Sequence, residues 1–354
     1  MNILITGGAG FVGSNLAKAF RKDLPSARIV AFDNLKRRGS EFNITALKSI
    51  NVEFIHGDVR SASDLESLPG SFDLMVEASA EPSVLAGLDG SPNYLLDTNL
   101  VGTLNCLNFA RSRVDQMVFL STSRVYSIDP LKSINLVEKE TRLEIANEQT
   151  LPGVTTAGIS EKFPVHLPRS LYGATKLASE YMIQEYSYAF NKKAIINRCG
   201  VIAGPGQFGK TDQGVFTLWV ANHYFKKKLK YTGFGGTGKQ VRDLLHPLDL
   251  YALIQKQVPM IEKHNGGVFN VGGGHLNSVS LQELTRICER IVGNSIQIDS
   301  DLTTSPVDIP TFVTDSSVAN QVFSWNPARS VEDIVSDIFN WIRQNEAMLK
   351  PLFG

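Results

Sequence analysis

A tyrosine and a lysine four residues apart form the first pattern in this chain that could do chemistry. Tyr172 and Lys176 open a stretch whose apolar spacing predicts a helix over Tyr172–Phe190. Residues at i and i+4 share one face of a helix, so the ammonium can lie near the phenol. A free tyrosine has a pKa of ~10, and a neighbouring cation favours the phenolate. The pair is a candidate acid–base group, although the same spacing also occurs in helices that only pack.

A run of hydroxyl side chains supplies a second candidate. Ser121, Thr122 and Ser123 follow the apolar segment Gln116–Leu120. Ligands of open parallel sheets bind in the crevice beyond the carboxyl ends of the strands. A hydroxyl at that point could hydrogen-bond the substrate oxygen that Tyr172 deprotonates. The alternative for Ser and Thr after a strand is ordinary turn formation.

Three glycines between the first apolar run and the first helix suit a phosphate-binding loop. Gly7, Gly10 and Gly13 would allow a tight turn, the approach of a pyrophosphate and close packing of helix on strand. The helix N-terminus offers unpaired N–H groups to the anion. The sequence therefore predicts a dinucleotide-binding loop.

The acid at the end of the second apolar run bears on which dinucleotide is bound. Asp33 lies about 20 residues beyond the glycines, where it would accept hydrogen bonds from ribose hydroxyls. Its charge would repel a 2′-phosphate, which favours NAD over NADP. Arg37 and Arg38 leave NADP open, because an arginine there could hold the extra phosphate.

Short apolar runs alternate with helical segments through the first half of the chain. Runs without polar alternation are typical of strands buried on both faces of a parallel sheet. They are Asn2–Thr6, Arg28–Phe32, Val52–Ile55, Asp73–Glu77, Gln116–Leu120 and Ala194–Asn197, with helices expected over Phe11–Lys22 and Tyr94–Arg113. Strand–helix–strand repetition predicts an α/β fold with a doubly wound parallel sheet, a Rossmann fold.

The second half predicts a smaller domain interleaved with that sheet. We expect residues 1–200 to form the dinucleotide-binding domain, with its sheet completed by segments at about 240–275. Residues 201–354 would mostly form a substrate-binding α/β domain, with helices near Val215–Lys228, Ser280–Val292 and Val331–Asn345. The polar, Pro- and Gly-rich stretch Ile128–Arg169 lies between the two candidate catalytic segments, which favours a border of the active site.

The amino-acid composition limits which binding partners and which cellular compartment are expected. The 354 residues are 43% apolar, and Lys+Arg and Asp+Glu each number 35, so no basic excess points to nucleic acid or anionic lipid. No segment approaches the ~18–20 apolar residues of a membrane span. Three scattered cysteines and the absence of a signal-peptide pattern favour a reducing, cytoplasmic setting. No metal site is expected.

Together these motifs resemble the extended short-chain dehydrogenase/reductase family. The resemblance rests on Thr6–Gly13, Asp33, His56–Asp58, Asn99–Asn105, Ser121–Tyr126, Tyr172–Lys176 and Gln240–Leu250, and it covers nearly the whole chain. It implies that Thr122, Tyr172 and Lys176 are the catalytic triad, with Lys176 also holding the ribose. It implies NAD as cofactor, a nucleotide-diphosphate sugar as substrate and a homodimer built on the two long helices.

The resemblance also implies the ligand-binding residues. Besides those already named, the cofactor would contact Phe11, Val12, Asn34, Asp58, Val59, Ala78, Ser79, Ala80, Asn99, Ser121 and Cys199. The substrate would contact Ser83, Thr122, Ser123, Arg124, Gln207, Gln213, Arg242 and Asp308, with Arg242 on the diphosphate or ribose.

Within the family, the segments around Gly204–Phe208, Asp212–Gly214 and Gly238–Asp243 resemble the CDP-paratose (CDP-tyvelose) 2-epimerases. Related 4,6-dehydratases carry Asp-Glu after the catalytic threonine, where this chain has Ser123 and Arg124, so dehydration is not expected. Epimerisation at C2 is the favoured activity. A dehydrogenase or reductase with exchangeable cofactor, or a non-catalytic NAD-binding protein, stays open.

Three departures from the family pattern accompany the resemblance. Glu77 begins the segment that usually reads His-x-Ala-Ala. Ser305 stands where the family has an arginine three residues before Asp308, so a cation is missing there. Cys199 replaces a common aromatic residue, and a small buried filler is its simplest interpretation.

Overall fold

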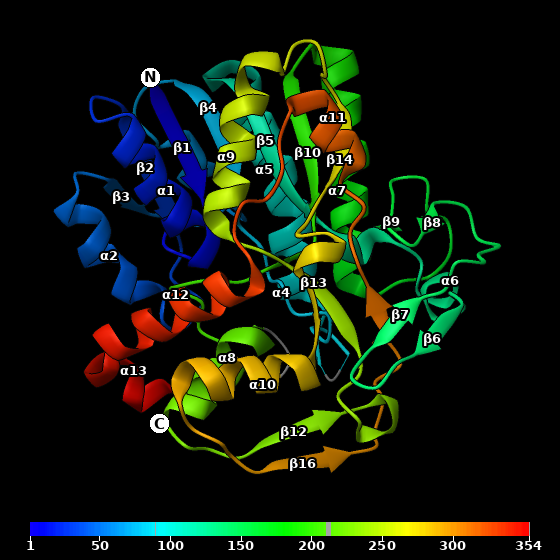
Figure 1. Ribbon diagram of the computed structural model, residues 1–354. Helices are drawn as coiled ribbons and strands as arrows, with labels where there is room; N and C mark the ends of the chain where they lie inside the picture. Colours follow the sequence, from blue (N-terminus) through cyan, green and yellow to red (C-terminus); the bar gives the residue numbers. More distant parts are fainter. Residues whose placement is uncertain (89, 210–213, 354) are drawn as a thin grey trace.

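A parallel sheet of seven strands forms the centre of the protein, seen in a computed structural model that describes residues 1–88, 90–209 and 214–353 (Figure 1). Its strand order is β14-β10-β5-β4-β1-β2-β3. The strands are β1 (Asn2–Thr6), β2 (Arg28–Asp33), β3 (Glu53–His56), β4 (Phe72–Glu77), β5 (Val114–Thr122), β10 (Lys193–Cys199) and β14 (Gly267–Val271). The order reverses beside β1, which opens a crevice at the carboxyl ends of the strands.

Helices cover both faces of this sheet, which explains why the strand sequences are apolar on both faces. One face packs against α1 (Phe11–Asp23), α2 (Ser40–Ser49), α9 (Pro247–Gln257) and α11 (Ser317–Phe323). The other packs against α3 (Ala62–Glu66), α5 (Gly102–Arg113) and α7 (Leu171–Phe190). The predicted doubly wound Rossmann fold is confirmed.

The helix expected over Tyr94–Arg113 contains a local irregularity. It starts as α4 (Asn93–Leu96), passes through a π-helical segment at Asp97–Val101 and continues as α5. Single π-helical turns are rare and often occur at functional sites. Asn99, one of the expected cofactor contacts, lies in this segment.

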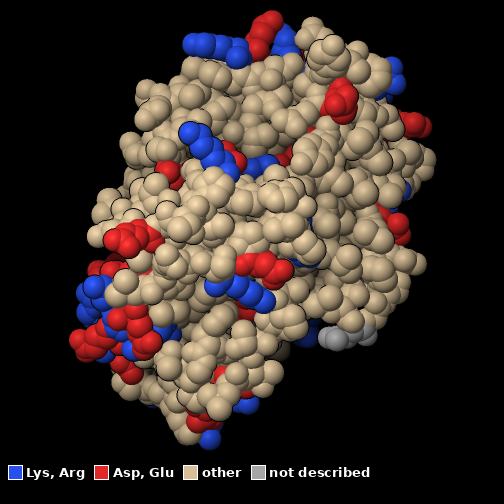
Figure 2. Space-filling model, turned by 90° about the vertical axis from the view of Figure 1, so that its right-hand side faces the viewer, with Lys and Arg blue, Asp and Glu red and all other residues tan. Residues whose placement is uncertain are grey.

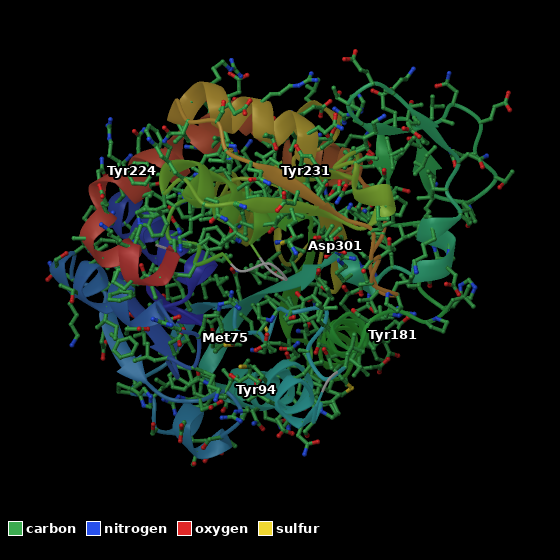
Figure 3. All side chains as sticks on the ribbon, turned by 90° about the horizontal axis from the view of Figure 1, so that it is seen from below. Met75, Tyr94, Tyr181, Tyr224, Tyr231 and Asp301 are labelled. Carbon is green, nitrogen blue, oxygen red and sulfur yellow. The ribbon has the colours of Figure 1, made fainter. Side chains whose placement is uncertain are left out.

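Segments that follow β10 form a second body with its own core, in the lower part of Figure 1. It contains a small sheet of β11 (Val201–Ile202), β13 (Val241–Leu245), β15 (Ser278–Ser280) and β17 (Thr311–Phe312), and the pair β12 (Leu229–Thr232) and β16 (Ile298–Asp301). Its helices are α8 (Val215–Tyr224), α10 (Leu281–Val292), α12 (Val331–Gln344) and α13 (Glu346–Phe353). Seen from below, Met75 and Tyr94 lie in one half of the molecule, and Tyr224, Tyr231 and Asp301 in the other (Figure 3).

Helix α8 is shorter than the sequence predicts. It ends at Tyr224 instead of Lys228, because Lys226 adopts a left-handed backbone conformation with φ 56°. A run of lysines carries no signal for such a turn.

The polar stretch between the two catalytic segments is ordered. It forms the short helix α6 (Ile128–Lys132) and two hairpins, β6 (Leu136–Glu138) with β7 (Leu143–Ile145) and β8 (Val154–Thr155) with β9 (Gly158–Ile159). A small core that includes Tyr126, Leu177 and Phe312 attaches it to the segments on either side of the crevice. On this side of the molecule, charged side chains of both signs are interspersed (Figure 2).

Cys106, Cys199 and Cys288 are all buried and unpaired, so no disulfide joins them. Within the described residues, no helix is both long and apolar enough to cross a bilayer.

Candidate active site

The glycine loop leaves a bare backbone surface at the start of α1. Gly7 has φ 64°, which L side chains rarely adopt, and the Gly10 N–H donates to the Gly7 carbonyl at 3.0 Å. A Cβ on Gly13 would stand 2.2 Å from that same oxygen. The first turn of α1 contains no acid, and its N-cap residue, Gly10, has no side chain that could cap the helix. The free N–H groups and the positive end of the helix dipole therefore suit an anion such as a pyrophosphate.

Gly13→Ala is expected to abolish measurable NAD binding, because the added methyl must displace the Gly7 carbonyl. Isothermal titration with NAD measures the loss. Gly90→Ala is a matched control, since a Cβ at Gly90 meets no atom within 4 Å, and its affinity should equal that of the wild type. A Gly13→Ala protein with normal NAD affinity would show that the loop does not contact the dinucleotide.

Asp33 lies directly against this loop. Its carboxylate accepts hydrogen bonds from the Ala9 N–H at 3.1 Å and the Leu35 N–H at 2.8 Å. Burial raises the pKa of Asp33, and the backbone N–H groups of Leu35, Ala9 and Gly10 oppose that rise. The carboxylate is thus fixed at the edge of the loop, where a ribose would lie.

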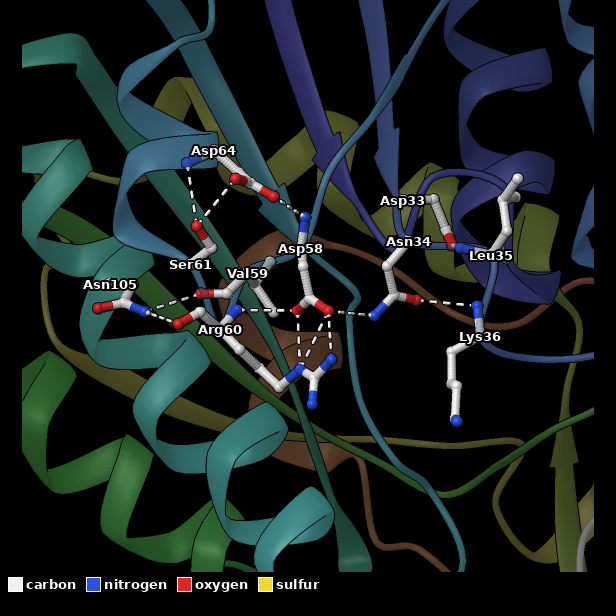
Figure 4. A network of polar contacts seen from close by, with 10 residues as sticks. All are labelled: Asp33, Asn34, Leu35, Lys36, Asp58, Val59, Arg60, Ser61, Asp64 and Asn105. Carbon is white, nitrogen blue, oxygen red and sulfur yellow. Dashed lines mark hydrogen bonds and ion pairs between the residues drawn. The ribbon is translucent and has the colours of Figure 1, made fainter.

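A polar network around Asp58 continues the same edge (Figure 4). The Asp58 carboxylate accepts from Asn34 Nδ2 at 2.9 Å and pairs with Arg60 at 2.6 Å. The Arg60 guanidinium in turn lies 4.8 Å from the ring centre of Tyr94. Sequence reasoning missed Arg60, since a lone arginine after a strand has no distinguishing pattern.

Arg37 contacts the second body. Its guanidinium donates to the Phe208 carbonyl at 3.2 Å, on the segment that follows β11. Arg38 is exposed. The Arg37 contact therefore ties the loop after β2 to the second body.

The expected contacts after β4 also come together beside the glycine loop. The Ala78 carbonyl lies so close that a Cβ on Gly7 would be 2.8 Å from its oxygen, and Ser79 Oγ donates to Thr6 Oγ1 at 2.7 Å. Asn99 anchors this segment through two hydrogen bonds with the Glu81 backbone, at 2.8 and 3.0 Å. Ala80 is partly buried between them, and Val59 packs against Gly102.

The three expected catalytic residues lie at the carboxyl end of β5 and the first turns of α7. Ser170 caps α7 by accepting from the Gly173 N–H at 3.1 Å, which fixes the turn that carries Tyr172. Gly173 packs so tightly that a Cβ would stand 2.0 Å from the Arg124 carbonyl oxygen. Thr122, two residues before Arg124, hydrogen-bonds Tyr172. The structure thus brings Thr122 and Tyr172 together across 50 residues of chain.

Burial dominates the ionisation of Tyr172 in the protein chain by itself. It raises the pKa of Tyr172 to about 12, while the hydrogen bond with Thr122 and the charge of Arg124 lower it. In the chain alone, burial therefore outweighs the effect of the neighbouring cation on the Tyr172 phenol. Arg124, a residue expected only as a substrate contact, is a cation that acts on this phenol.

Lys176 is 2% exposed, and its Nζ lies 3.9 Å from the ring centre of Phe119. Burial lowers the pKa of Lys176 to about 8, and the nearby Glu77 opposes that change. Glu77 is also buried, and its Oε1 accepts from Thr103 Oγ1 at 2.6 Å. The lysine therefore lies between the sheet, α5 and α7, next to a carboxyl group.

Two arginines and one acid lie together in a cluster beside the catalytic residues, with Arg124 in the turn after β5 and Arg242 and Asp308 in the second body. Arg242 on β13 pairs with Asp308 at 3.1 Å, and Arg124 Nη1 donates to the Val307 carbonyl at 3.4 Å. Burial lowers the pKa of Arg124 to about 10, as does the charge of Arg242, whereas Asp308 and Tyr172 raise it. Asp308 pairs with Arg242 while Arg124 adds a second positive charge nearby, and the excess positive charge suits an anion.

A buried network beneath this cluster escaped sequence reasoning. Glu180 on α7 pairs with Arg198 on β10 at 2.7 Å and accepts from Ser121 Oγ at 2.5 Å. Arg198 also donates to Tyr126 Oη at 3.3 Å, and that hydroxyl donates to Asn270 Oδ1 at 2.7 Å. The network joins the ends of β5, β10 and β14 to α7. The one available signal was the acid at position 180, four residues beyond Lys176 on the same helix face.

The remaining expected residues are more dispersed. Cys199 is buried, which raises its thiol pKa to about 12, and Ser123 follows Thr122 in a 3-10 turn. Ser83 is buried and its Oγ accepts from the Leu85 N–H at 3.2 Å. The Gln207 side chain accepts a hydrogen bond from Thr217 Oγ1 and donates one to the Ile202 carbonyl.

Gln213 lies outside the described residues. Phe11 and Val12 lie in the first turn of α1, partly buried.

The comparisons with known proteins agree with this geometry. The sequence profile of the NAD-dependent epimerase/dehydratase family matches residues 3–272. The chain is also 31% identical to the CDP-paratose 2-epimerase of Salmonella typhi, over 96% of this chain and 99% of that protein. The chain belongs to the NAD-dependent epimerase/dehydratase family.

Solved structures support the same assignment of fold. The X-ray structure of Pal from Bacillus thuringiensis superimposes with a TM-score of 0.78 at 28% identity, covering 97% of this chain and 99% of that one. The UDP-glucuronic acid 4-epimerase of Bacillus cereus, solved with UDP-glucuronic acid and NAD, gives 0.77 at 23% identity, covering 97% and 99%. The family is NAD-dependent, and the bare glycine loop and the Asp33 carboxylate of this chain fit NAD.

Proposed function

We propose that this protein is an NAD-dependent epimerase that inverts C2 of a nucleotide-diphosphate-linked deoxyhexose, with CDP as the favoured nucleotide. The preference for CDP and for C2 rests on the similarity to the CDP-paratose 2-epimerase. The observation that carries the proposal is the position of Arg124, whose charge acts on both Tyr172 and Arg242. Arg124 thus links the acid–base group to the cationic cluster.

That link favours chemistry close to the diphosphate. In a sugar nucleotide, C2 is bonded to C1, which carries the diphosphate, whereas C4 lies on the opposite side of the ring. With the diphosphate at Arg242 and Arg124, C2 would come near Tyr172. Asp308 would orient Arg242 through their ion pair and limit the excess charge.

The cofactor would lie along the edge described above. Gly7, Gly10 and Gly13 would face its pyrophosphate, Asp33 and Asn34 its adenosine ribose, and Asp58 and Val59 its adenine. Ala78, Ser79, Ala80, Asn99, Ser121 and Cys199 would line the path toward Lys176. When bound there, NAD would supply reversible hydride transfer at the sugar carbon.

The side chains of the protein would manage the proton. Tyr172 would take the proton from the sugar hydroxyl at its Oη and later return it, and Thr122 would hold the same sugar oxygen by a hydrogen bond. Lys176 would bind the nicotinamide ribose and add positive charge near the phenol. Such acid–base assistance contributes about 10²–10⁴-fold to rate.

A deuterium-labelled substrate tests the reaction. The protein is incubated with a CDP-deoxyhexose carrying deuterium at C2, and the products are followed by NMR and at 340 nm. We expect the C2 epimer with deuterium retained and no net NADH. Stoichiometric NADH would instead indicate a dehydrogenase, and deuterium lost to water would exclude hydride return. Inversion of C4 would refute the position proposed here.

Arg124→Met is expected to raise KM for the sugar nucleotide about 10- to 100-fold, because a hydrogen bond to a charged group contributes about 1.5–3 kcal/mol. Initial rates against substrate concentration measure it, and NAD affinity should not change. Lys132→Met is the matched control. Its Nζ donates to the Pro306 carbonyl of the same segment from an exposed position, so its KM should stay at the wild-type value. Equal effects of both variants would mean that Arg124 only holds the segment.

We also propose a homodimer and a division of labour between two domains. Tyr181 and Tyr188 on α7 and Val101 beside α5 are exposed, which suits a face where two copies pack. Light scattering of the protein as it elutes from a gel-filtration column gives its molar mass and tests the homodimer. Residues 1–200 with about 240–275 would hold the cofactor, and most of 201–354 the substrate. The three unpaired, buried cysteines suit a cytoplasmic protein.

A further inference from the structure

Glu77 is a buried acid whose contacts leave half of its carboxyl group without a partner. It ends β4, is 1% exposed and points toward α5, where Oε1 accepts from Thr103. Oε2 makes no hydrogen bond to any described residue. Burying a carboxylate is costly unless a charge or a donor compensates it. The position therefore calls for a cation nearby.

Lys176 lies in the same pocket. Glu77 and Phe119 are register partners on the neighbouring strands β4 and β5, so their side chains stand side by side on the face covered by α5 and α7. The Lys176 ammonium lies over the Phe119 ring at 3.9 Å. The ammonium group is therefore close to the Glu77 carboxyl.

The other groups that act on Lys176 cannot serve as its counter-ion. They are Cys199 on β10, Glu180 on α7 and Cys106 on α5. Burial raises the thiol pKa of both cysteines, so they stay neutral. Glu180 is already paired with Arg198. Among the described residues, Glu77 is thus the acid available to Lys176.

We propose that Glu77 is a positioning residue for Lys176: its carboxylate is the counter-ion that keeps the buried ammonium charged and holds it beneath the nicotinamide ribose. Only the ribose contact rests on the proposed function. The proximity of the two groups follows from the chain alone.

The two groups should influence each other's titration. Burial lowers the pKa of Lys176 to about 8, and Glu77 opposes that shift. Burial raises the pKa of Glu77 to about 7, and the charge of Lys176 opposes this rise. Removing the acid should therefore lower the pKa of Lys176 further, and removing the lysine should raise that of Glu77.

Titration of the protein labelled with 13C at lysine Cε tests the pairing without substrate. Glu77→Gln keeps the size of the side chain and an oxygen for Thr103 but removes the charge. We expect the Lys176 midpoint, identified by its loss in Lys176→Met, to fall by about one pH unit or more. In a kinetic assay, the upper pKa of the pH profile of kcat should fall by a similar amount. The variant should therefore lose activity at a lower pH than the wild type as the pH is raised.

Cys106→Ala is the matched control, because it disturbs the same pocket without changing its charge, and its Lys176 midpoint should not move. Should Glu77→Gln fail to fold, the converse measurement remains: Lys176→Met should raise the midpoint of 13C-labelled Glu77 above about 7. Unchanged midpoints in both variants would overturn the inference. Because neither titration needs a sugar nucleotide, a failed epimerase assay with shifted midpoints would reject the function and keep the pairing.

Discussion

Tyr172→Phe is expected to lower kcat by about 10²–10⁴-fold, the usual contribution of a positioned acid–base group. The variant loses only the hydroxyl that hydrogen-bonds Thr122, while the ring, 9% exposed, can keep its packing. NAD binding should therefore survive. Turnover of the sugar nucleotide and titration with NAD measure the two effects separately.

Tyr181→Phe is the matched control for this prediction. Tyr181 lies on the same helix, on the face proposed for the dimer, and is 53% exposed in the single chain. Loss of its hydroxyl should leave kcat at the wild-type value. Full activity in the Tyr172→Phe protein would remove Tyr172 from the acid–base role, whatever the fold. A loss of both turnover and NAD affinity would instead indicate a damaged site.

Arg198→Met is expected to lower the free energy of unfolding by about 3–5 kcal/mol, because it leaves Glu180 as a buried charge without its partner. Glu180 is 1% exposed and receives three hydrogen bonds from Arg198, at 3.1, 3.0 and 2.7 Å. Denaturant titration followed by circular dichroism gives the change in free energy.

Two further variants identify the cause of that loss. Replacing Arg198 and Glu180 together by methionine should recover most of the stability, since a buried ion pair is often no more stabilising than apolar side chains of similar size. Lys193→Met, on the same strand, breaks a pair with Glu262 that is largely exposed, and should cost about 1 kcal/mol or less. If Arg198→Met costs no more than Lys193→Met, the buried network does not support the site.

The amino-acid sequence determined the features that depend on neighbours in the chain. The glycine loop, Asp33 and six of the seven strands of the central sheet were predictable because turn chemistry and apolar runs are local, and β1 was found with its observed bounds, Asn2–Thr6. The spacing of Tyr172 and Lys176 on one helix was local as well. Family resemblance then supplied roles for residues that no local pattern marks.

Only the tertiary structure decided which charges meet. Glu77 lies near Lys176 because β4 lies beside β5 under α5 and α7. Arg124 approaches the segment of Asp308 because β13 and β17 bring the second body to the crevice. Glu180 and Arg198 meet because α7, which carries the acid, packs on β10, which carries the arginine. Such pairs have no signature in a single sequence, because their energy depends on burial and distance, and both are fixed only when the sheet and its covering helices have packed.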